Sequence, residues 1–398
     1  MKLSIYTIAS PLHDKKSTNE TSFQLLKSLN IEHEYKGNNF SDYGSSILNL
    51  IYIQTGGTEG IFKSLLPQLI QQFSQPFYLL TSGKSNSLAA SMEILSYLRQ
   101  NNLKGEILHG ESSYITRRIH LLMRVNEAKQ QLKDCKLGII GKPSDWLISS
   151  NVDKQIVKDK LGINLIDIPI EKVIDICKKI NVSDEEKWQK YATSENIKQA
   201  LSGANKIYFA LKEIIEEYNL QGFTIRCFDL LPALNNTGCL ALARINAEGI
   251  VAGCEGDVPA MLSMKIAHAL TGITGFQANP SNINPITGQI LFAHCTIPFN
   301  MIERFEFLTH FESGIGIGIR GYMKKGPITI FKVNGNMDRY FAEEGELLQC
   351  EDKPNLCRTQ QLIQLSPETT QYFLTNPIGN HHIVVPSHCK QLITQFFQ

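Results

Sequence analysis

The stretch IVAGCEGDVPAMLSMKIAHALTG, residues 250–272, decides how the fold of this chain is interpreted. A short apolar run from Ile250 to Gly253 is typical of a strand, and Glu255 and Asp257 follow it with one glycine between them. A helical pattern then begins at once, with apolar residues on one face. Carboxylates at the end of a strand and in front of a helix usually face a cleft. The stretch therefore predicts an α/β unit with two acidic side chains at its edge.

Upstream of this stretch, predicted strands and helices alternate as they do in an open parallel sheet. Within residues 1–131, the runs LSIYTIAS, SILNLIYIQ and FYLLTS predict strands, and helical spacing follows each of them. Within residues 132–250, the runs KLGIIG, NLIDIPI, FTIRCF and LALARI predict strands. An amphipathic helix is predicted over 183–219, interrupted near Ser202-Gly203. The sequence thus predicts two small α/β (Rossmann-like) domains, with boundaries near 131 and 250.

Downstream of the predicted helix at 258–271, the pattern changes to one dominated by strands. QILFAHCTIP, FEFLTHF, GIGIGIRGY, PITIFKV and HHIVVP all have strand character, and glycines and prolines are frequent between them. Such a series of short strands is typical of an antiparallel barrel. We therefore expect a β-rich carboxy-terminal domain over residues 251–398, and an α/β fold class for the chain as a whole.

The composition limits the classes of function. Lys and Arg number 39 and Asp and Glu number 38, so no basic excess exists to bind a nucleic-acid backbone. No apolar run approaches the ~20 residues of a membrane span. The nine cysteines are scattered without CxxC pairs, which favours the reduced thiols of a cytoplasm over a disulfide framework. We therefore expect a cytoplasmic protein without a nucleic-acid or membrane partner.

The acidic stretch and three downstream histidines together predict a metal site. Carboxylate oxygens are the usual ligands of Mn²⁺ and Mg²⁺, and imidazoles bind transition ions, so Glu255, Asp257 and His294 are candidates. His381 and His382 are neighbours on a predicted strand, and only one of them can face a given site. Asp257 has an equal alternative, because an acidic residue at a helix start caps the helix.

Four segments resemble the L-fucose isomerase and L-arabinose isomerase superfamily, especially its shorter fucose-isomerase-like members. They are CEGDVPAMLSM, LFAHCTIP, THFESGIGIGIRG and GNHHIVV, and the resemblance is strongest over 224–389. It implies two α/β domains followed by a β-rich domain. It also implies an aldose–ketose isomerase that works on a small sugar through an enediol, with Mn²⁺ (or Mg²⁺) as cofactor. In this superfamily a neighbouring subunit closes the site, which implies a homo-trimer or homo-hexamer.

The resemblance carries particular roles to this chain. By position, Asp257 matches the superfamily's metal-binding aspartate, and His381 matches its histidine ligand. The other catalytic carboxylate of the superfamily is a glutamate in a motif like RCWPE. The corresponding segment here is RCFDL, residues 226–230, so either Asp229 or Glu255 takes its place. The expected catalytic residues are then Asp257, Asp229 and Glu255, and the expected metal ligands are Asp257, His381 and Glu255.

Other polar side chains are expected to meet the hydroxyl groups of an open-chain sugar. These candidates for substrate binding are Trp146, Ser144, Arg320 and His294. His310 and Glu312 alternate on one predicted strand face, so they can line a polar cleft.

Two alternatives use the same fold. The missing upstream glutamate favours a non-catalytic sugar-binding or regulatory protein, whereas Asp257 and the histidine doublet favour an enzyme. A metal-dependent lyase or epimerase would use the same enediolate chemistry. Metal content distinguishes the non-catalytic binder from the isomerase, because a binder does not need an ion.

Overall fold

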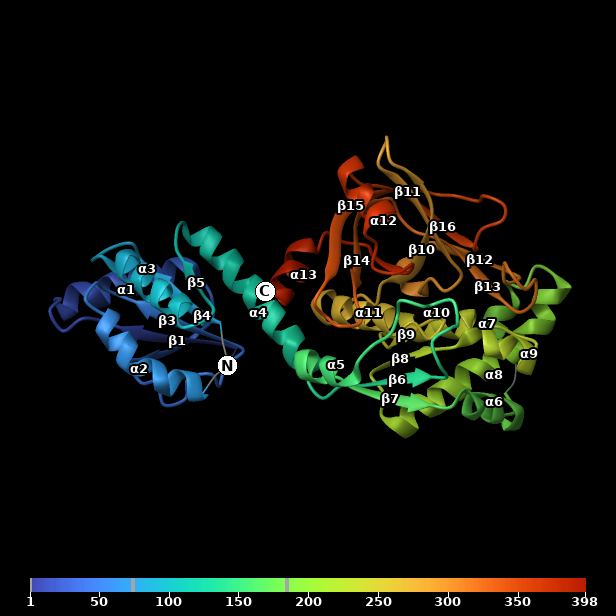
Figure 1. The fold of residues 1–398 in the computed structure, drawn as a ribbon, viewed down its shortest axis with the longest axis horizontal. Helices are drawn as coiled ribbons and strands as arrows, with labels where there is room; N and C mark the ends of the chain where they lie inside the picture. Colours follow the sequence, from blue (N-terminus) through green and yellow to red (C-terminus); the bar gives the residue numbers. More distant parts are fainter. Residues whose placement is uncertain (1, 73–75, 183–185) are drawn as a thin grey trace. The chain divides into compact units, whose positions relative to one another are not determined.

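The computed structural model describes residues 2–72, 76–182 and 186–398 of the chain (Figure 1). It divides into two units, Met1–Glu127 and Ala128–Gln398. The first unit holds one parallel sheet, and the second holds another parallel sheet and a closed barrel. The mixed α/β fold with a β-rich carboxy-terminal region is thereby confirmed. The domain boundaries expected near 131 and 250 stay predictions.

The first unit is a five-stranded parallel sheet in the order β2-β1-β3-β4-β5. Its strands are β1 (Leu3–Ile8), β2 (Glu34–Gly37), β3 (Leu48–Ile53), β4 (Phe77–Thr81) and β5 (Gly105–Leu108). Its helices are α1 (Lys15–Leu29), α2 (Glu59–Gln72), α3 (Ser87–Gln100) and α4 (Ser112–Leu132), the last of which continues into the second unit. Strands β1, β3 and β4 are buried at every position, because helices cover both faces. Helices α2 and α3 pack on one face, and α1 and α4 pack on the other.

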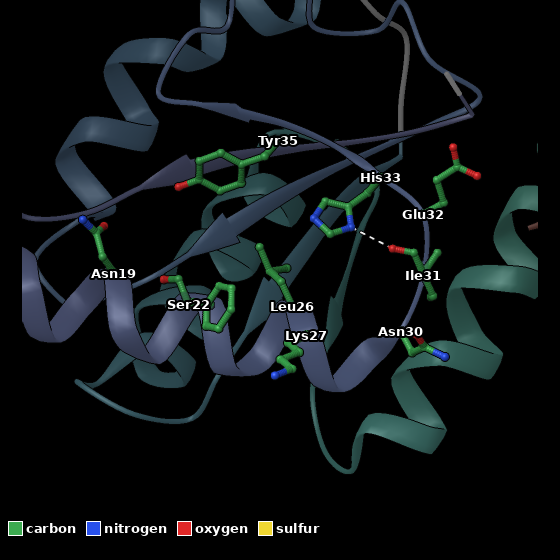
Figure 2. Close-up of a pocket in the computed structure, with 10 residues that line it drawn as sticks. Asn19, Ser22, Leu26, Lys27, Asn30, Ile31, Glu32, His33 and Tyr35 are labelled. Carbon is green, nitrogen blue, oxygen red and sulfur yellow. Dashed lines mark hydrogen bonds between the residues drawn. The ribbon is translucent and has the colours of Figure 1, made fainter.

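A pocket of about 790 Å³ lies between α1 and β2 in this first unit (Figure 2). Phe23, Leu26, Ile31 and Tyr35 give it a largely apolar lining. Its one histidine, His33, hydrogen-bonds through Nδ1 to the Ile31 carbonyl at 2.8 Å. The pocket therefore does not contain the carboxylates and histidines predicted from the sequence to form a site.

The second unit begins with a four-stranded parallel sheet in the order β7-β6-β8-β9. Its strands are β6 (Lys136–Ile140), β7 (Asn164–Ile168), β8 (Gly222–Ile225) and β9 (Val251–Gly253). The accompanying helical segments are α5 (Lys154–Leu161), α6 (Ile170–Lys179), α7 (Glu186–Gln189), α8 (Glu195–Tyr218), η1 (Cys227–Asp229), α9 (Leu230–Leu234) and α10 (Cys239–Ala247). Because the strands are parallel, all four carboxyl ends lie at one edge of the sheet, where the acidic segments follow β8 and β9.

A closed antiparallel barrel completes the second unit, with neighbours in the order β10-β11-β16-β15-β14-β17. Its strands are β10 (Phe276–Asn284), β11 (Gln289–His294), β14 (Gly326–Val333), β15 (Tyr340–Cys350), β16 (Thr359–Gln364) and β17 (His382–Val385). A two-stranded ribbon, β12 (Arg304–Leu308) and β13 (Gly318–Tyr322), lies outside the closed barrel. The remaining helical segments are η2 (Phe299–Met301), α12 (Pro367–Thr375) and α13 (Lys390–Phe397).

Helix α11 (Val258–Thr271) packs against both the parallel sheet and the barrel (Figure 1). It contacts β8 and β9 of the sheet and β10, β14 and β17 of the barrel. All its residues except His268 and Thr271 are buried. The turn in front of α11, which carries Glu255 and Asp257, is therefore held against the barrel.

Two predicted elements of the second unit were wrong. The run LALARI lies in helix α10, not in a strand. This helix is buried on all sides, so no polar face marks its period, and a short apolar run can suit either structure. Helix α8 passes through Ser202-Gly203 without a break. A Cβ at Gly203 would come within 2.5 Å of Asn236 Nδ2, so this glycine allows a close approach and ends no helix. Residues 183–185 of that prediction lie outside the described residues.

No helix in the described part of the chain combines the length and the apolar character that crossing a bilayer requires.

Candidate metal and active site

The turn after β9 has a backbone conformation that is costly for Glu255. Its φ is +62°, and that of Gly256 is +70°. A left-handed conformation at a residue other than glycine costs about 1–3 kcal/mol and tends to occur at functional sites. A Cβ at Gly256 would overlap the carbonyl oxygen of Lys142, so only glycine fits there. The packing around the turn thus fixes the direction in which Glu255 points.

Glu255 points at two histidines from the barrel. One ligand atom from each of Glu255, His294 and His381 lies within 4.8 Å of the others, and all three residues are buried. Glu255 Oε1 lies 3.4 Å from His381 Nε2 and 3.6 Å from His294 Nε2. His294 ends β11 and His381 precedes β17, and β10 pairs with both strands. These three residues are called the Glu255 cluster below.

The Nδ1 atoms of both histidines are already engaged, so their Nε2 atoms remain for the cluster. His381 Nδ1 lies 2.9 Å from Asp257 Oδ2, and His294 Nδ1 lies 3.0 Å from Thr296 Oγ1. A ligating histidine is usually oriented in this way by a partner on its other nitrogen. His381 Nε2 is buried and has no well-formed hydrogen bond to any described residue. One carboxylate, two oriented imidazoles and an unsatisfied buried nitrogen fit a divalent metal ion.

Asp257 lies behind His381 and is fully buried. It caps α11 by accepting a hydrogen bond from Ala260 N at 2.8 Å, so the capping alternative is the one observed. Its carboxylate also lies 3.3 Å from Nζ of Lys332, which is buried in β14. Burial alone would raise the pKa of Asp257, but Lys332, His381 and the Ala260 N–H lower it to about 2. Asp257 is thus an anion that orients His381. Its expected role as a metal ligand stays a prediction, and it is not part of the Glu255 cluster.

Glu255 and His381 each stabilise the charged form of the other. Burial alone would raise the pKa of Glu255, but His381 and His294 outweigh it and hold that pKa far below its usual value. Burial would lower the pKa of His381, yet Glu255 and Asp257 raise it to about 9. For His294, burial outweighs Glu255 and lowers the pKa. Without an ion, the cluster is therefore an anionic Glu255, a cationic His381 and a neutral His294.

Comparisons with known proteins indicate which family the chain resembles. Residues 151–272 match the family model of the L-arabinose isomerase central domain. A sulfoquinovose isomerase from Alkalicoccus urumqiensis is 24% identical over 288 residues, which cover 68% of this chain and 64% of that protein. Sulfoquinovose isomerases from Priestia aryabhattai and Priestia megaterium are 22% identical over 323 residues, which cover 75% of this chain and 71% of each relative. The resemblance to the fucose and arabinose isomerase superfamily is confirmed.

The stretch matched by the superfamily's central domain contains only part of the site. It includes Glu255 and Asp257, whereas His294 and His381 lie beyond its end. The chain spans somewhat less than two thirds of the Alkalicoccus relative's length. The two histidines of the Glu255 cluster are therefore positioned by the structure and not by the family match.

Trp146 contacts the Glu255 cluster directly. Its indole Nε1 donates to Glu255 Oε2 at 2.7 Å, and its ring is half-exposed. The ring packs edge-on against Phe228 at 4.9 Å, and Phe228 packs edge-on against His310 at 5.7 Å. These three rings form an aromatic wall that begins at Glu255. Ser144 contributes its backbone N–H, which donates to the Glu255 carbonyl at 2.9 Å.

The structure does not bring Asp229 into the Glu255 cluster. Asp229 Oδ1 accepts from Arg226 Nε at 3.0 Å, and Arg226 also forms an ion pair with Asp145 at 2.9 Å. Asp229 and Arg226 line a pocket of about 920 Å³, whose lining residues include neither Glu255 nor a histidine. Of the two residues expected to replace the superfamily's upstream glutamate, Glu255 is the one that faces the histidines.

Arg320 and His382 have partners elsewhere. Arg320 forms ion pairs with Asp352 and Glu306 beside the β12–β13 ribbon. His382 lies among aromatic rings, where its Nε2 is 2.9 Å from the hydroxyl of Tyr372. Burial lowers the pKa of His382 to about 3. His382 thus has structural partners, as expected for a neighbour that points away from His381.

The sequence reasoning missed Lys332 and Thr296, and it missed the contact between Trp146 and Glu255. A signal existed for Lys332, because a lysine inside the apolar strand PITIFKV has to find a buried partner. The Trp146 contact joins residues 109 positions apart, and no local pattern reports it.

Proposed function

We propose that the chain is a divalent-metal-dependent aldose–ketose isomerase that acts through an enediol. The observation that carries this proposal is the buried Glu255 cluster, with its unsatisfied His381 Nε2. The relatives named sulfoquinovose isomerases support the class of reaction, and they suggest sulfoquinovose as the first substrate to test.

Glu255 and the Nε2 atoms of His294 and His381 would hold the ion. When bound, a divalent ion polarises the sugar carbonyl and stabilises the negative charge of the enediolate. Two imidazole ligands favour a transition ion such as Mn²⁺ over Mg²⁺. Asp257 holds His381 with Nε2 toward the cluster, and its buried charge is balanced by Lys332.

The reaction moves one proton from C2 to C1 and another between the two oxygens. With Glu255 assigned to the ion, we assign proton transfer to His310 and Glu312. The support for this assignment is that His310 belongs to the aromatic wall that begins at Glu255, with its ring 5.7 Å from that of Phe228, and that Glu312 lies two residues further along the chain. Glu312 is exposed, but partial desolvation and then Glu255 raise its pKa, which moves a carboxyl group toward the pH range where acid–base catalysis is efficient. His310 is neutral at pH 7, because burial and neighbouring positive charges lower its pKa to about 4.

The aromatic wall formed by Trp146, Phe228 and His310 offers an apolar face for the C–H groups of a sugar. The half-exposed ring of Trp146 is the accessible part of it. Ser144, His294 and Arg320 stay candidates for hydroxyl contacts. We also keep the homo-trimer or homo-hexamer as a proposal, and light scattering of the purified chain tests it.

The decisive experiment is proton exchange at C2. The Mn²⁺-loaded protein is incubated in D₂O with sulfoquinovose, L-fucose, L-arabinose and other aldoses, and deuterium at C2 is followed by NMR. We expect exchange with at least one sugar, and we expect Glu255→Gln to abolish it while Asp229→Asn does not. Absence of exchange with every sugar, in protein shown to hold the ion, would refute the isomerase.

A non-catalytic sugar-binding protein remains the second candidate. It is favoured by the pairing of Asp229 with Arg226, which leaves the superfamily's upstream glutamate without a counterpart at that strand end. Calorimetric titration with the same sugars separates the two, because a binder would give heat of binding and no exchange.

A further inference from the structure

The loop after β6 contacts the turn of Glu255 at three points. The Lys142 carbonyl oxygen lies where a side chain on residue 256 would be. The Ser144 N–H donates to the Glu255 carbonyl at 2.9 Å. Trp146 Nε1 donates to the Glu255 carboxylate at 2.7 Å. The loop thus contacts both the main chain and the side chain of a residue whose backbone conformation is unfavourable by itself.

The two carboxylate oxygens of Glu255 have different surroundings. Oε1 faces the Nε2 atoms of His294 and His381, whereas Oε2 accepts the indole N–H of Trp146. A hydrogen bond to a carboxylate is stronger than one between neutral groups, and it restricts the rotation of the carboxylate. The hydrogen bond from Trp146 therefore occupies Oε2 and leaves Oε1 for the cluster.

We propose that Trp146 is a positioning residue that makes Glu255 a one-oxygen donor to the metal. This inference deepens the proposed function and rests on it. A carboxylate that offers one oxygen, with two imidazoles, supplies three protein donors, so coordination positions remain for sugar oxygens. Without the indole N–H, the carboxylate of Glu255 is free to rotate.

Loss of the indole N–H can be separated from loss of the fold. Trp146 is 52% exposed, so Trp146→Phe removes little buried area and keeps a ring against Phe228. Trp188 offers a matched control, since its Nε1 is buried without a hydrogen-bond partner in the part of the chain that is described. It packs against Phe299 and Phe307 at a hydrophobic cluster that does not include Glu255. Trp188→Phe thus makes the same chemical change without removing a hydrogen bond.

The experiment measures Mn²⁺ affinity by calorimetry in the wild type and in both variants. Partners of metal ligands typically contribute about 10–100-fold to affinity. We expect Trp146→Phe to weaken Mn²⁺ binding by about tenfold or more, and Trp188→Phe to change it by less than about twofold, in line with that range. Trp146→His, which keeps a ring N–H, should recover part of the loss.

Fluorescence gives a second readout that does not depend on activity. The chain has two tryptophans, so Trp188→Phe leaves Trp146 as the sole reporter. Its emission should change during Mn²⁺ titration with the midpoint found by calorimetry, whereas the emission of Trp146→Phe should not change.

The outcomes separate this inference from the proposed function. If the wild type binds Mn²⁺ and a folded Trp146→Phe binds it equally well, the positioning role is refuted and the metal site stands. If Trp146→Phe does not fold, Trp188→Phe decides, because Mn²⁺ binding to that variant without any change in Trp146 emission refutes the role. If the wild type binds no divalent ion, the metal site fails and this inference fails with it.

Discussion

The ends of β8 and β9 are neighbours in one parallel sheet, and each is followed by acidic residues, but their surroundings differ. After β8, Asp229 has a side chain that is 39% exposed and pairs with Arg226. After β9, Glu255 is buried, faces two histidines and accepts a hydrogen bond from Trp146. A similar acid is thus part of a solvated ion pair at one strand end and of a candidate metal centre at the next.

The difference comes from what covers each strand end. β9 leads directly into α11, which packs against barrel strands β14 and β17, so its turn is enclosed by the barrel. The segment after β8 turns into η1 and lines the 920 Å³ pocket. Tertiary cover, more than residue type, therefore decides which acid is buried among histidines.

The largest effect is expected at the buried pair of Asp257 and Lys332. Asp257→Asn keeps a residue able to cap α11 but leaves the Lys332 ammonium without its buried counter-ion. Removing one partner of a buried pair costs about 3–5 kcal/mol, so the free energy of unfolding in urea should fall by that amount. The double variant Asp257→Asn/Lys332→Met should recover much of the loss. A loss below about 1 kcal/mol would show that the pair is not buried as described.

A second large effect is a loss of stability in acid caused by His310. Its pKa is lowered to about 4 by burial and by its neighbours His294 and Arg358, against 6.5 for the ordinary group. Between about pH 6.5 and pH 4, His310 therefore binds a proton in the unfolded chain but not in the folded chain. Stability should fall by about 3 kcal/mol as the pH decreases through this window, at about 1.4 kcal/mol per unit. His310→Gln should flatten the curve, whereas His388→Gln, at an exposed position, should not.

At the β9 end, Glu255→Gln should weaken Mn²⁺ binding by about a hundredfold or more. Loss of a residue that only orients a metal ligand typically costs about 10–100-fold, and loss of the ligand itself should cost more. The amide keeps the shape of the side chain but removes the anionic donor and the charge that faces His381. Calorimetric titration of the folded variant measures this loss. Affinity within a factor of about three of the wild type would remove Glu255 from the proposed site.

At the β8 end, Asp229→Asn should change Mn²⁺ affinity by less than about twofold, since a solvated surface pair contributes at most about 1 kcal/mol. Arg226 keeps its other acceptors, Asp145 and the Pro143 carbonyl. The same titration serves as the measurement. A loss as large as that of Glu255→Gln would show that the two strand ends form one site, contrary to the comparison.

Much of the fold could be predicted from local patterns. The largely apolar runs of strands β1, β3 and β4 and the change to short strands after α11 are properties of the sequence itself. The carboxylates after β9 and the histidines were also visible as types and positions. Helix α10 was mistaken for a strand because burial on every side removes the period that distinguishes the two.

The arrangement of the candidate site required the closed barrel. Which carboxylate faces the Nε2 atoms of both histidines depends on the left-handed turn at Glu255 and on the position of Lys332 in β14. Neither feature has a local signature in residues 250–272. Asp229 looked equivalent to Glu255 in the sequence, because the sequence does not show that Asp229 pairs with Arg226 in the folded chain.

Helix α11 has a consequence for how the second unit unfolds. A helix without a solvent-facing side belongs to the cores of the sheet and the barrel at once. Neither layer can lose its order without exposing one face of this helix to water. The sheet and the barrel should therefore melt as a single cooperative transition, and a fragment cut on either side of α11 should not reach a native state alone.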